Sequence, residues 1–287
     1  MKGLFQNYSS GLKIIVFFGV LLLALTLVLF ISGLALMSGN ADNITMQKIL
    51  QLVQSIGLYA IPPLVFAYLV SENPLEFLKI NKTGSAKSYF WVVPVMLAAI
   101  PLINLLGFFN QQVVFPEFLS ELEKQFIAYE EQLADLTEKF LAASSVSGLI
   151  FNLFLMAVVP AVSEELLFRG AVQQLIGGQR HQILAIWLTA FIFSAIHFQF
   201  YGFLPRFLLG AFLGYLFYWS KSLWLPILAH FTNNAAVVIF YFLYNNKKIT
   251  LNPDEIGIND MWYLGVASAV VVTVFVFGLR KNQDTVR

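Results

Sequence analysis

Long apolar stretches separated by short polar segments dominate this chain. A helix needs about 20 mainly apolar residues to cross the hydrocarbon core of a bilayer. Applied along the sequence, that length predicts about eight membrane-spanning helices and therefore an all-α, polytopic membrane protein. The predicted spans are Leu12–Met37, Gln47–Val70, Tyr89–Phe109, Ser147–Ile176, Gln182–Phe200, Leu204–Ser220, Ser222–Tyr244 and Met261–Leu279.

Two of the predicted spans have an unusual length. Leu204–Ser220 is short and joined to the next span by almost no loop, so seven full spans and one re-entrant segment are an alternative. Ser147–Ile176 is too long for an upright helix. We expect it to tilt, or to break near Pro160, because proline removes one backbone hydrogen bond and clashes with the preceding turn.

A polar segment separates the third and fourth predicted spans. Its sequence, "FPEFLSELEKQFIAYEEQLADLTEKFLAA", places apolar residues near helical spacing among many acids. This pattern is typical of an amphipathic helix or helical hairpin outside the bilayer. The chain then divides into four parts: N-terminal transmembrane helices (1–110), an amphipathic extramembrane segment (111–146), a helical core (147–245), and a loop with a C-terminal transmembrane helix (246–287).

Composition supports the membrane assignment. The chain is 59% hydrophobic and 11% charged, whereas a soluble domain has about 45–50% apolar and about 25% charged residues. The absence of cysteine excludes disulfides, thiolate metal sites and a cysteine nucleophile. A formal net charge of +1 gives no reason to expect a nucleic-acid partner. The first apolar run continues to Met37, so we interpret it as a retained span, because a signal h-region has only about 7–15 residues.

The distribution of lysine and arginine predicts the orientation. With the N-terminus inside, the predicted cytoplasmic segments carry more of these residues than the opposite side, to which Arg206 is assigned. Since cytoplasmic loops are enriched in Lys and Arg, we expect both termini in the cytoplasm. The compact length and the lack of recognisable organelle signals favour a bacterial inner (plasma) membrane.

Several ionisable and amide residues lie inside the predicted spans. A charged side chain near the bilayer centre costs about 2.5–3.5 kcal/mol on insertion scales, and it usually faces a partner or a cavity. Three spans, the fourth, fifth and seventh, carry such residues. They are Glu164, Glu165 and Arg169, then His197, then His230, Asn233 and Asn234.

Helical spacing indicates which of these side chains can meet. Glu165 and Arg169 are four residues apart on one face, the arrangement in which an acid and a base pair. Glu164 lies about 100° around the helix and is not used by that pair. His230 and Asn234 also share a face. Asn233 is expected to point elsewhere.

These residue types suit the hydrolysis of a carbonyl compound. A glutamate and a histidine can hold and deprotonate a water, and a second histidine and an amide can donate hydrogen bonds to the resulting oxyanion. The candidate catalytic residues are Glu164, His197, His230 and Asn234. The ion pair of Glu165 and Arg169 would fix the helix and keep positive charge near the site. Each motif alone fits a structural role equally well, but three motifs at compatible depths favour catalysis.

The three motifs together resemble those of a known family. "EELLFR" (Glu164–Arg169) fits EExxxR, "FSAIH" (Phe193–His197) fits FxxxH, and "HFTNN" (His230–Asn234) fits HxxxN. In this order they are similar to the CAAX-protease and bacteriocin-processing family (CPBP, Abi) of intramembrane glutamic endopeptidases, over roughly residues 147–245.

The resemblance implies an endopeptidase without a cofactor that acts on a membrane-associated peptide or protein. It implies that Glu164 and His197 activate water, and that His230 and Asn234 stabilise the oxyanion. The expected partners are a peptide or protein substrate, lipidated or unlipidated, and the lipid bilayer, with no nucleic acid. A prenylated substrate would need a eukaryotic-type prenylation system.

Three alternatives stay open. The first is a zinc peptidase with Glu164, His197 and His230 as ligands, although HExxH is absent and Arg169 would oppose a divalent cation. The second is a non-proteolytic bacteriocin-immunity or regulatory membrane protein on the same scaffold. The third is a transporter, since midplane polar groups on broken spans also suit substrate and ion sites, although no internal repeat stands out.

Overall fold

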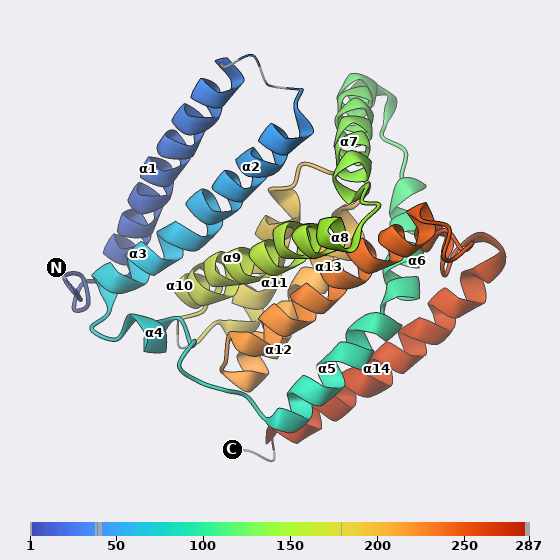
Figure 1. The fold of residues 1–287 in the computed structure, drawn as a ribbon. Helices are drawn as coiled ribbons and strands as arrows, with labels where there is room; N and C mark the ends of the chain where they lie inside the picture. The colour runs from blue at the N-terminus through green and yellow to red at the C-terminus, as the bar shows by residue number, and fades with distance from the viewer. Residues whose placement is uncertain (1, 38, 40–41, 179, 285–287) are drawn as a thin grey trace.

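The computed structural model describes residues 2–37, 39, 42–178 and 180–284, and every regular element in these ranges is helical. The predicted all-α class is therefore confirmed. Met1 and residues 285–287, which belong to the predicted terminal segments, lie outside the described residues. Figure 1 shows the helices packed along their lengths, with α1 at one side and the antiparallel pair α5 and α14 at the other.

The order of the elements follows the predicted apolar stretches. The main helices of the N-terminal half are α1 (Ser10–Met37), α2 (Ile44–Gln54), α3 (Ile61–Val70), α4 (Pro74–Phe77), α5 (Ala86–Ala98), α6 (Ile100–Gln111) and α7 (Ser120–Leu141). Those of the C-terminal half are α8 (Val146–Leu153), α9 (Val159–Leu167), α10 (Gln173–Gly177), α11 (Gln182–Ala195), α12 (Phe203–Ser220), α13 (Trp224–Asn245) and α14 (Trp262–Asp284).

Short π-helical and 3-10 segments complete the chain. The π-helical segments are η1 (Ser55–Ala60), η3 (Phe154–Val158) and η4 (Phe168–Val172), and the 3-10 segments are η2 (Glu117–Leu119), η5 (Pro253–Glu255) and η6 (Asn259–Met261). Each π-helical segment lies inside a longer continuous helix. Such π turns occur frequently at functional sites.

The helices identify an integral membrane protein, but the predicted number of eight spans is not confirmed. Within the described residues, five helical stretches are long and apolar enough to cross a membrane. These are Ser10–Met37, Ile44–Val70, Val146–Gly177, Trp224–Asn245 and Asn259–Gly278. Helices α5 and α6 meet at an angle of 45° and make a sixth candidate if counted as one span. Helix α11 has 14 residues, fewer than the length of a typical span.

The fourth predicted span is one continuous stretch, Val146–Gly177, rather than a helix broken at Pro160. The π-helical segment η3 ends two residues before Pro160, and the N–H of Val159 bonds to the carbonyl of Phe154, five residues earlier. Widening the turn by one residue accommodates the missing proline N–H without ending the helix. Of the two alternatives expected for this span, tilt or break, the break does not occur: the helix continues through Pro160, and the irregularity takes the form of π turns.

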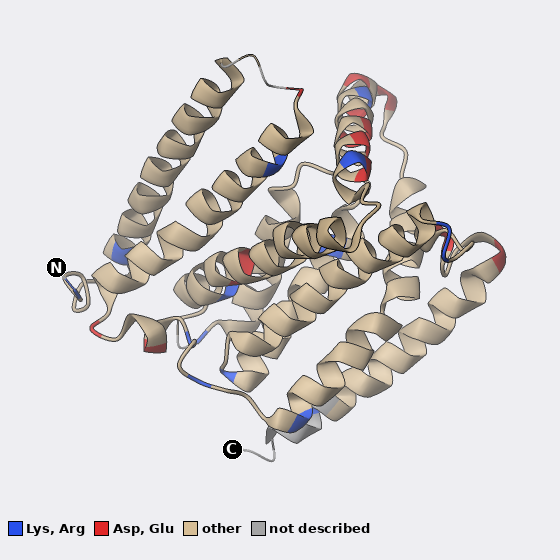
Figure 2. Ribbon diagram, in the orientation of Figure 1, with Lys and Arg blue, Asp and Glu red and all other residues tan. Residues whose placement is uncertain are grey.

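Helix α7 carries a concentration of acids, as Figure 2 shows. Its C-terminal end is tied to the helices that carry the spans: Lys48 Nζ donates to the Phe140 carbonyl at 3.0 Å and to Asn152 Oδ1 at 2.9 Å. Near its N-terminal end, Glu123 accepts a hydrogen bond from the Tyr201 hydroxyl at 2.9 Å, and Glu130 accepts one from the Tyr201 backbone N–H at 2.9 Å. The predicted amphipathic segment thus forms a helix held against the loop between α11 and α12.

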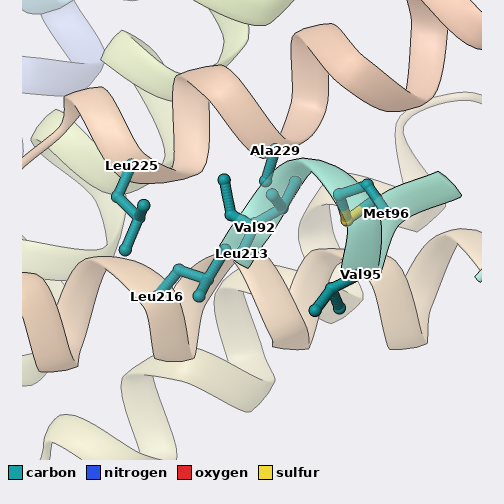
Figure 3. Close-up of a cluster of buried hydrophobic side chains, with 7 residues drawn as sticks. All are labelled: Val92, Val95, Met96, Leu213, Leu216, Leu225 and Ala229. Atoms are coloured by element: carbon teal, nitrogen blue, oxygen red, sulfur yellow. The ribbon is translucent and has the colours of Figure 1, made fainter. Parts of the chain in front are cut away.

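A buried apolar cluster packs α5, α12 and α13 together (Figure 3). Its members are Val92, Val95, Met96, Leu213, Leu216, Leu225 and Ala229. On the other side of α12, helix α11 approaches closely at Gly210, where an added Cβ would lie 3.1 Å from Phe193 Cδ1 and 3.3 Å from Ala190 Cα. A side chain at position 210 would push the two helices apart, so the glycine brings the backbone of α12 within reach of Arg169.

Candidate active site

A cavity of about 290 Å³ lies among α6, α9, α11, α12 and α13. The four predicted catalytic residues, Glu164, His197, His230 and Asn234, all line it. They come from three segments that are separated by more than thirty positions in the sequence, so the fold and not local sequence brings them together. The remaining lining residues are Ile103, Phe193, Gly202, Pro205, Arg206, Leu209 and Asn233.

A fully buried ion pair supports the cavity. Arg169 Nη1 donates to Glu165 Oε1 at 2.8 Å, and both side chains have 0% exposure. Arg169 Nη2 also donates to the Gly210 carbonyl on α12 at 2.7 Å, and its guanidinium lies 5.1 Å from the centre of the Phe193 ring on α11. Arg169 therefore connects the α9–η4 stretch to two neighbouring helices, which the spacing of Glu165 and Arg169 alone could not show.

Glu165 also contacts His230. The distance from His230 Nδ1 to Glu165 Oε1 is 2.9 Å. A carboxylate paired with arginine can only accept, so Nδ1 of His230 carries the proton in this contact. The other ring nitrogen, Nε2, lies 3.9 Å from Glu164 Oε2. The two adjacent glutamates thus contact the same histidine from different sides.

His197 lies two residues past the end of α11 and is held by the backbone of that helix. Its Nδ1 lies 2.7 Å from the Phe193 carbonyl, and because a carbonyl oxygen only accepts, Nδ1 is the protonated nitrogen. In the neutral imidazole, Nε2 is then left as a hydrogen-bond acceptor. The Phe193 ring packs against both histidines, with ring centres 5.2 Å from His197 and 6.0 Å from His230.

The two asparagines of α13 act together, which corrects the prediction for Asn233. Both line the cavity, whereas Asn233 was expected to point elsewhere. Asn233 Nδ2 donates to Asn234 Oδ1 at 3.2 Å, which leaves Nδ2 of Asn234 as a donor. Neighbouring residues on an ideal helix point about 100° apart. The cavity is wide enough that Asn233 and Asn234 both line it despite this angle.

Sequence reasoning missed Arg206 as a site residue. It was assigned to the side of the membrane opposite the cytoplasm because it stands at the beginning of a predicted span, yet it lines the cavity beside Gly202 and Pro205. Its Nη2 donates to Gln199 Oε1 at 2.6 Å. One feature of the sequence could have indicated that Arg206 lies near the site: it stands nine residues after His197, in the segment that follows the FxxxH motif.

The zinc alternative requires Glu164, His197 and His230 to converge on one ion. No group of three or more His, Cys, Asp or Glu side chains with a metal-binding arrangement occurs among the described residues. The three side chains share a cavity without such an arrangement, so no catalytic step is assigned to a metal here.

Comparison with known proteins relates the core segment to a peptidase family. Residues 146–236 match the family described as type II CAAX prenyl endopeptidase Rce1-like, which confirms the predicted family resemblance for this segment. The description of that family names an endopeptidase, and the matched residues include all three sequence motifs whose residues line the cavity.

The chain is also similar to part of one bacterial protein, whereas no solved structure matches it significantly. An uncharacterized protein of Bacillus subtilis (strain 168), YpbD, is 30% identical over 104 residues, which are 35% of this chain and 49% of that protein. The matched part thus spans about half the length of this curated relative.

Proposed function

We propose that this protein is an intramembrane endopeptidase that hydrolyses a peptide bond in a membrane-associated peptide or protein. One observation carries the proposal: Glu164, His197, His230 and Asn234, from three separate segments, line a single cavity. Each has a polar group suited to one step of peptide hydrolysis. The match of residues 146–236 to a peptidase family supports the same activity.

Glu164 and His197 are proposed to activate the attacking water. Glu164 lines the cavity with a side chain that is 17% exposed, and it is not engaged in the ion pair of Glu165 with Arg169. His197 offers Nε2 as an acceptor because its Nδ1 is bound to the Phe193 carbonyl. A carboxylate and an imidazole acceptor on one cavity can hold a water and remove its proton as it attacks the carbonyl carbon.

His230 and Asn234 are proposed to stabilise the oxyanion that forms. Asn234 retains Nδ2 as a donor. For His230 to donate from Nε2 as well, both ring nitrogens would carry a proton, and Glu165 on the Nδ1 side would offset the charge. Donors that are fixed before the reaction avoid reorganisation when the charge develops. In this scheme Glu165 and Arg169 position His230 and do not touch the substrate.

The proposed location is a bacterial inner (plasma) membrane with both termini in the cytoplasm. The Bacillus subtilis relative supports a bacterial source, and the excess of basic residues on the predicted cytoplasmic side supports the orientation. The proposed substrate is a peptide or protein held at the bilayer, with or without a lipid anchor.

Cleavage in proteoliposomes tests the proposal. The wild-type protein would be incubated with pools of palmitoylated, farnesylated and unlipidated peptides, and the products identified by mass spectrometry. Glu164→Ala serves as the inactive variant, and Glu131→Ala, on the exposed face of α7, as its matched control. We expect internal cleavage of at least one pool by the wild type and by Glu131→Ala, but not by Glu164→Ala. No cleavage in any pool, or equal cleavage by Glu164→Ala, would count against an endopeptidase.

Two further measurements separate the alternatives. Retention of activity after treatment with a strong chelator would exclude a zinc requirement, and its loss and recovery with zinc would support one. If the protein is instead a non-proteolytic regulator, Glu164→Gln would keep its full biological effect. Proton-coupled substrate flux into the same liposomes would indicate a transporter.

A further inference from the structure

Arg206 is held in the wall of the cavity by a neutral neighbour. It lies in the first turn of α12, and its Nη2 donates to the side-chain oxygen of Gln199 at 2.6 Å. The guanidinium also lies against the backbone of Gly202, where an added Cβ would be 3.0 Å from Nη2. A flexible side chain is thereby fixed in one place, although none of these contacts neutralises its charge.

The hydrogen bonding of Arg206 is incomplete. Its Nη1 is buried and has no hydrogen-bond partner, and none of the ion pairs found among the described residues includes Arg206. Glu130 on α7 and Glu164 act on it electrostatically without contact. Arg169 also has one buried nitrogen without a partner, Nε, but unlike Arg206 it is paired directly with a carboxylate. A buried donor without an acceptor is unfavourable, so the position of Nη1 requires an explanation.

We propose that Arg206 is a specificity residue that binds a carboxylate of the substrate. The planar guanidinium presents parallel N–H groups that match the two oxygens of a carboxylate. Glu164, as the ionised base of the proposed mechanism, would place negative charge on the same cavity and repel an incoming carboxylate. Arg206 is the sole Lys or Arg among the described residues that line the cavity, and it supplies the compensating charge. This inference rests on the proposed function, which makes the cavity a peptide-binding site.

The carboxylate has two sources in a peptide. It is either the free C-terminal group, in which case cleavage occurs a few residues from the end of the substrate, or the side chain of an aspartate or glutamate near the cleaved bond. Both present the same group to the guanidinium. The two sources are distinguished by neutralising the C-terminal group in one set of peptides and the acidic side chain in another.

A binding measurement tests the proposal without requiring cleavage. The Glu164→Gln protein in nanodiscs would be immobilised and exposed to a pool of palmitoylated decapeptides of mixed sequence, prepared with a free C-terminal acid and with a C-terminal amide. A second pair of pools, both amidated, would carry either one aspartate or one asparagine. The ratio of the two forms retained is measured by mass spectrometry. We expect the carboxylate form of at least one pair to be retained about tenfold or more over its neutral form.

Substitutions of Arg206 identify the residue responsible. In the Glu164→Gln background, Arg206→Gln should reduce the preference to none, and Arg206→Lys should leave a few-fold preference, because it keeps the charge but loses the paired N–H groups. Lys124→Gln, an exposed change on α7, should leave the preference unaltered. Arg206→Lys and the unfolding midpoint of each variant control for a folding defect.

The outcomes separate this inference from the proposed function. Equal retention of the charged and neutral forms in both pairs would overturn the role of Arg206, as would a preference that persists in Arg206→Gln. Cleavage of the same pools by the wild-type protein tests endopeptidase activity independently. A carboxylate preference without cleavage would support the Arg206 site and contradict the proposed hydrolysis.

Discussion

Two helical stretches carry an acid and a base four residues apart, in very different surroundings. In the α9–η4 stretch, Glu165 and Arg169 are 2.8 Å apart and completely buried. On α7, Asp135 and Lys139 are 2.6 Å apart, with side chains 63% and 59% exposed. Their spacing in the sequence is identical. Burial and additional partners, namely His230 for Glu165 and the Gly210 carbonyl for Arg169, are what make the first pair part of a site.

The exposed pair on α7 and the buried pair of the α9–η4 stretch differ also in how solvent affects their charges. The pKa of Lys139 is raised by its hydrogen bond to Asp135 and by the charge of that carboxylate, so Lys139 stays charged across the neutral range. Solvent and salt screen such a pair, and its contribution to folding is small. The buried pair has no solvent to replace a missing partner, so its two charges depend on each other.

Arg169→Met should have the largest effect on stability. Removal of the guanidinium leaves the Glu165 carboxylate buried without its cation, and breaking a buried pair in this way costs about 3–5 kcal/mol. The free energy of unfolding, measured in detergent micelles, should fall by this amount. A loss as small as that of Lys139→Met, the matched change on α7, would show that burial does not distinguish the two pairs.

The double variant Glu165→Leu, Arg169→Met separates stability from positioning. Replacing both partners by apolar residues removes the uncompensated charge, so stability should return close to that of the wild type. Peptide hydrolysis should remain strongly reduced, because His230 loses the carboxylate that orients its Nδ1. Full recovery of hydrolysis would mean that the buried pair has only a structural role.

Asn234→Ala tests the donor that we assign to the oxyanion. Loss of one such donor reduces kcat by about 10²–10³-fold, with little change in KM. Asn233→Ala should reduce kcat far less, since Asn233 acts by holding Asn234 Oδ1. Steady-state kinetics of the two variants in the same proteoliposomes gives the comparison. A reversed order of the two effects would assign the donor to Asn233, and equal effects would contradict its assignment to Asn234 alone.

Asp135→Asn should have the smallest effect. The side chain is exposed and its partner Lys139 is solvated, so neither the unfolding midpoint nor the rate of hydrolysis should change measurably. Thermal unfolding at low and high salt checks this expectation. A clear loss of activity would indicate that the outer surface of α7 also takes part in function.

Local spacing was sufficient to predict part of the site. The separation of Glu165 and Arg169 by four residues indicated a pair, and the order of the three motifs indicated the family that residues 146–236 match. Both signals depend on residue type and helical periodicity, which the sequence displays directly.

Contacts between distant segments could not be predicted in the same way. The bond between Glu165 and His230 joins residues 65 positions apart, and Arg206 enters the cavity because α12 packs against α11 at Gly210. The π turns around Pro160 were not predicted: the sequence suggested a tilt or a break there, because proline disfavours a helix interior, but a wider turn accommodates it. The predicted number of eight spans is not confirmed, because apolar composition alone does not determine where a helix ends.

Hydrolysis by Glu164→Gln, relative to the wild type, tests the central claim most directly. The substitution keeps the size of the side chain but removes the carboxylate that is proposed to take a proton from water. With the peptide that the wild type cleaves best, the rate should fall by about 10²–10⁴-fold, while the unfolding midpoint and the activity of Glu131→Gln stay at wild-type values. A Glu164→Gln rate within about threefold of the wild type, far less than loss of a general base causes, would contradict a water-activating role for Glu164.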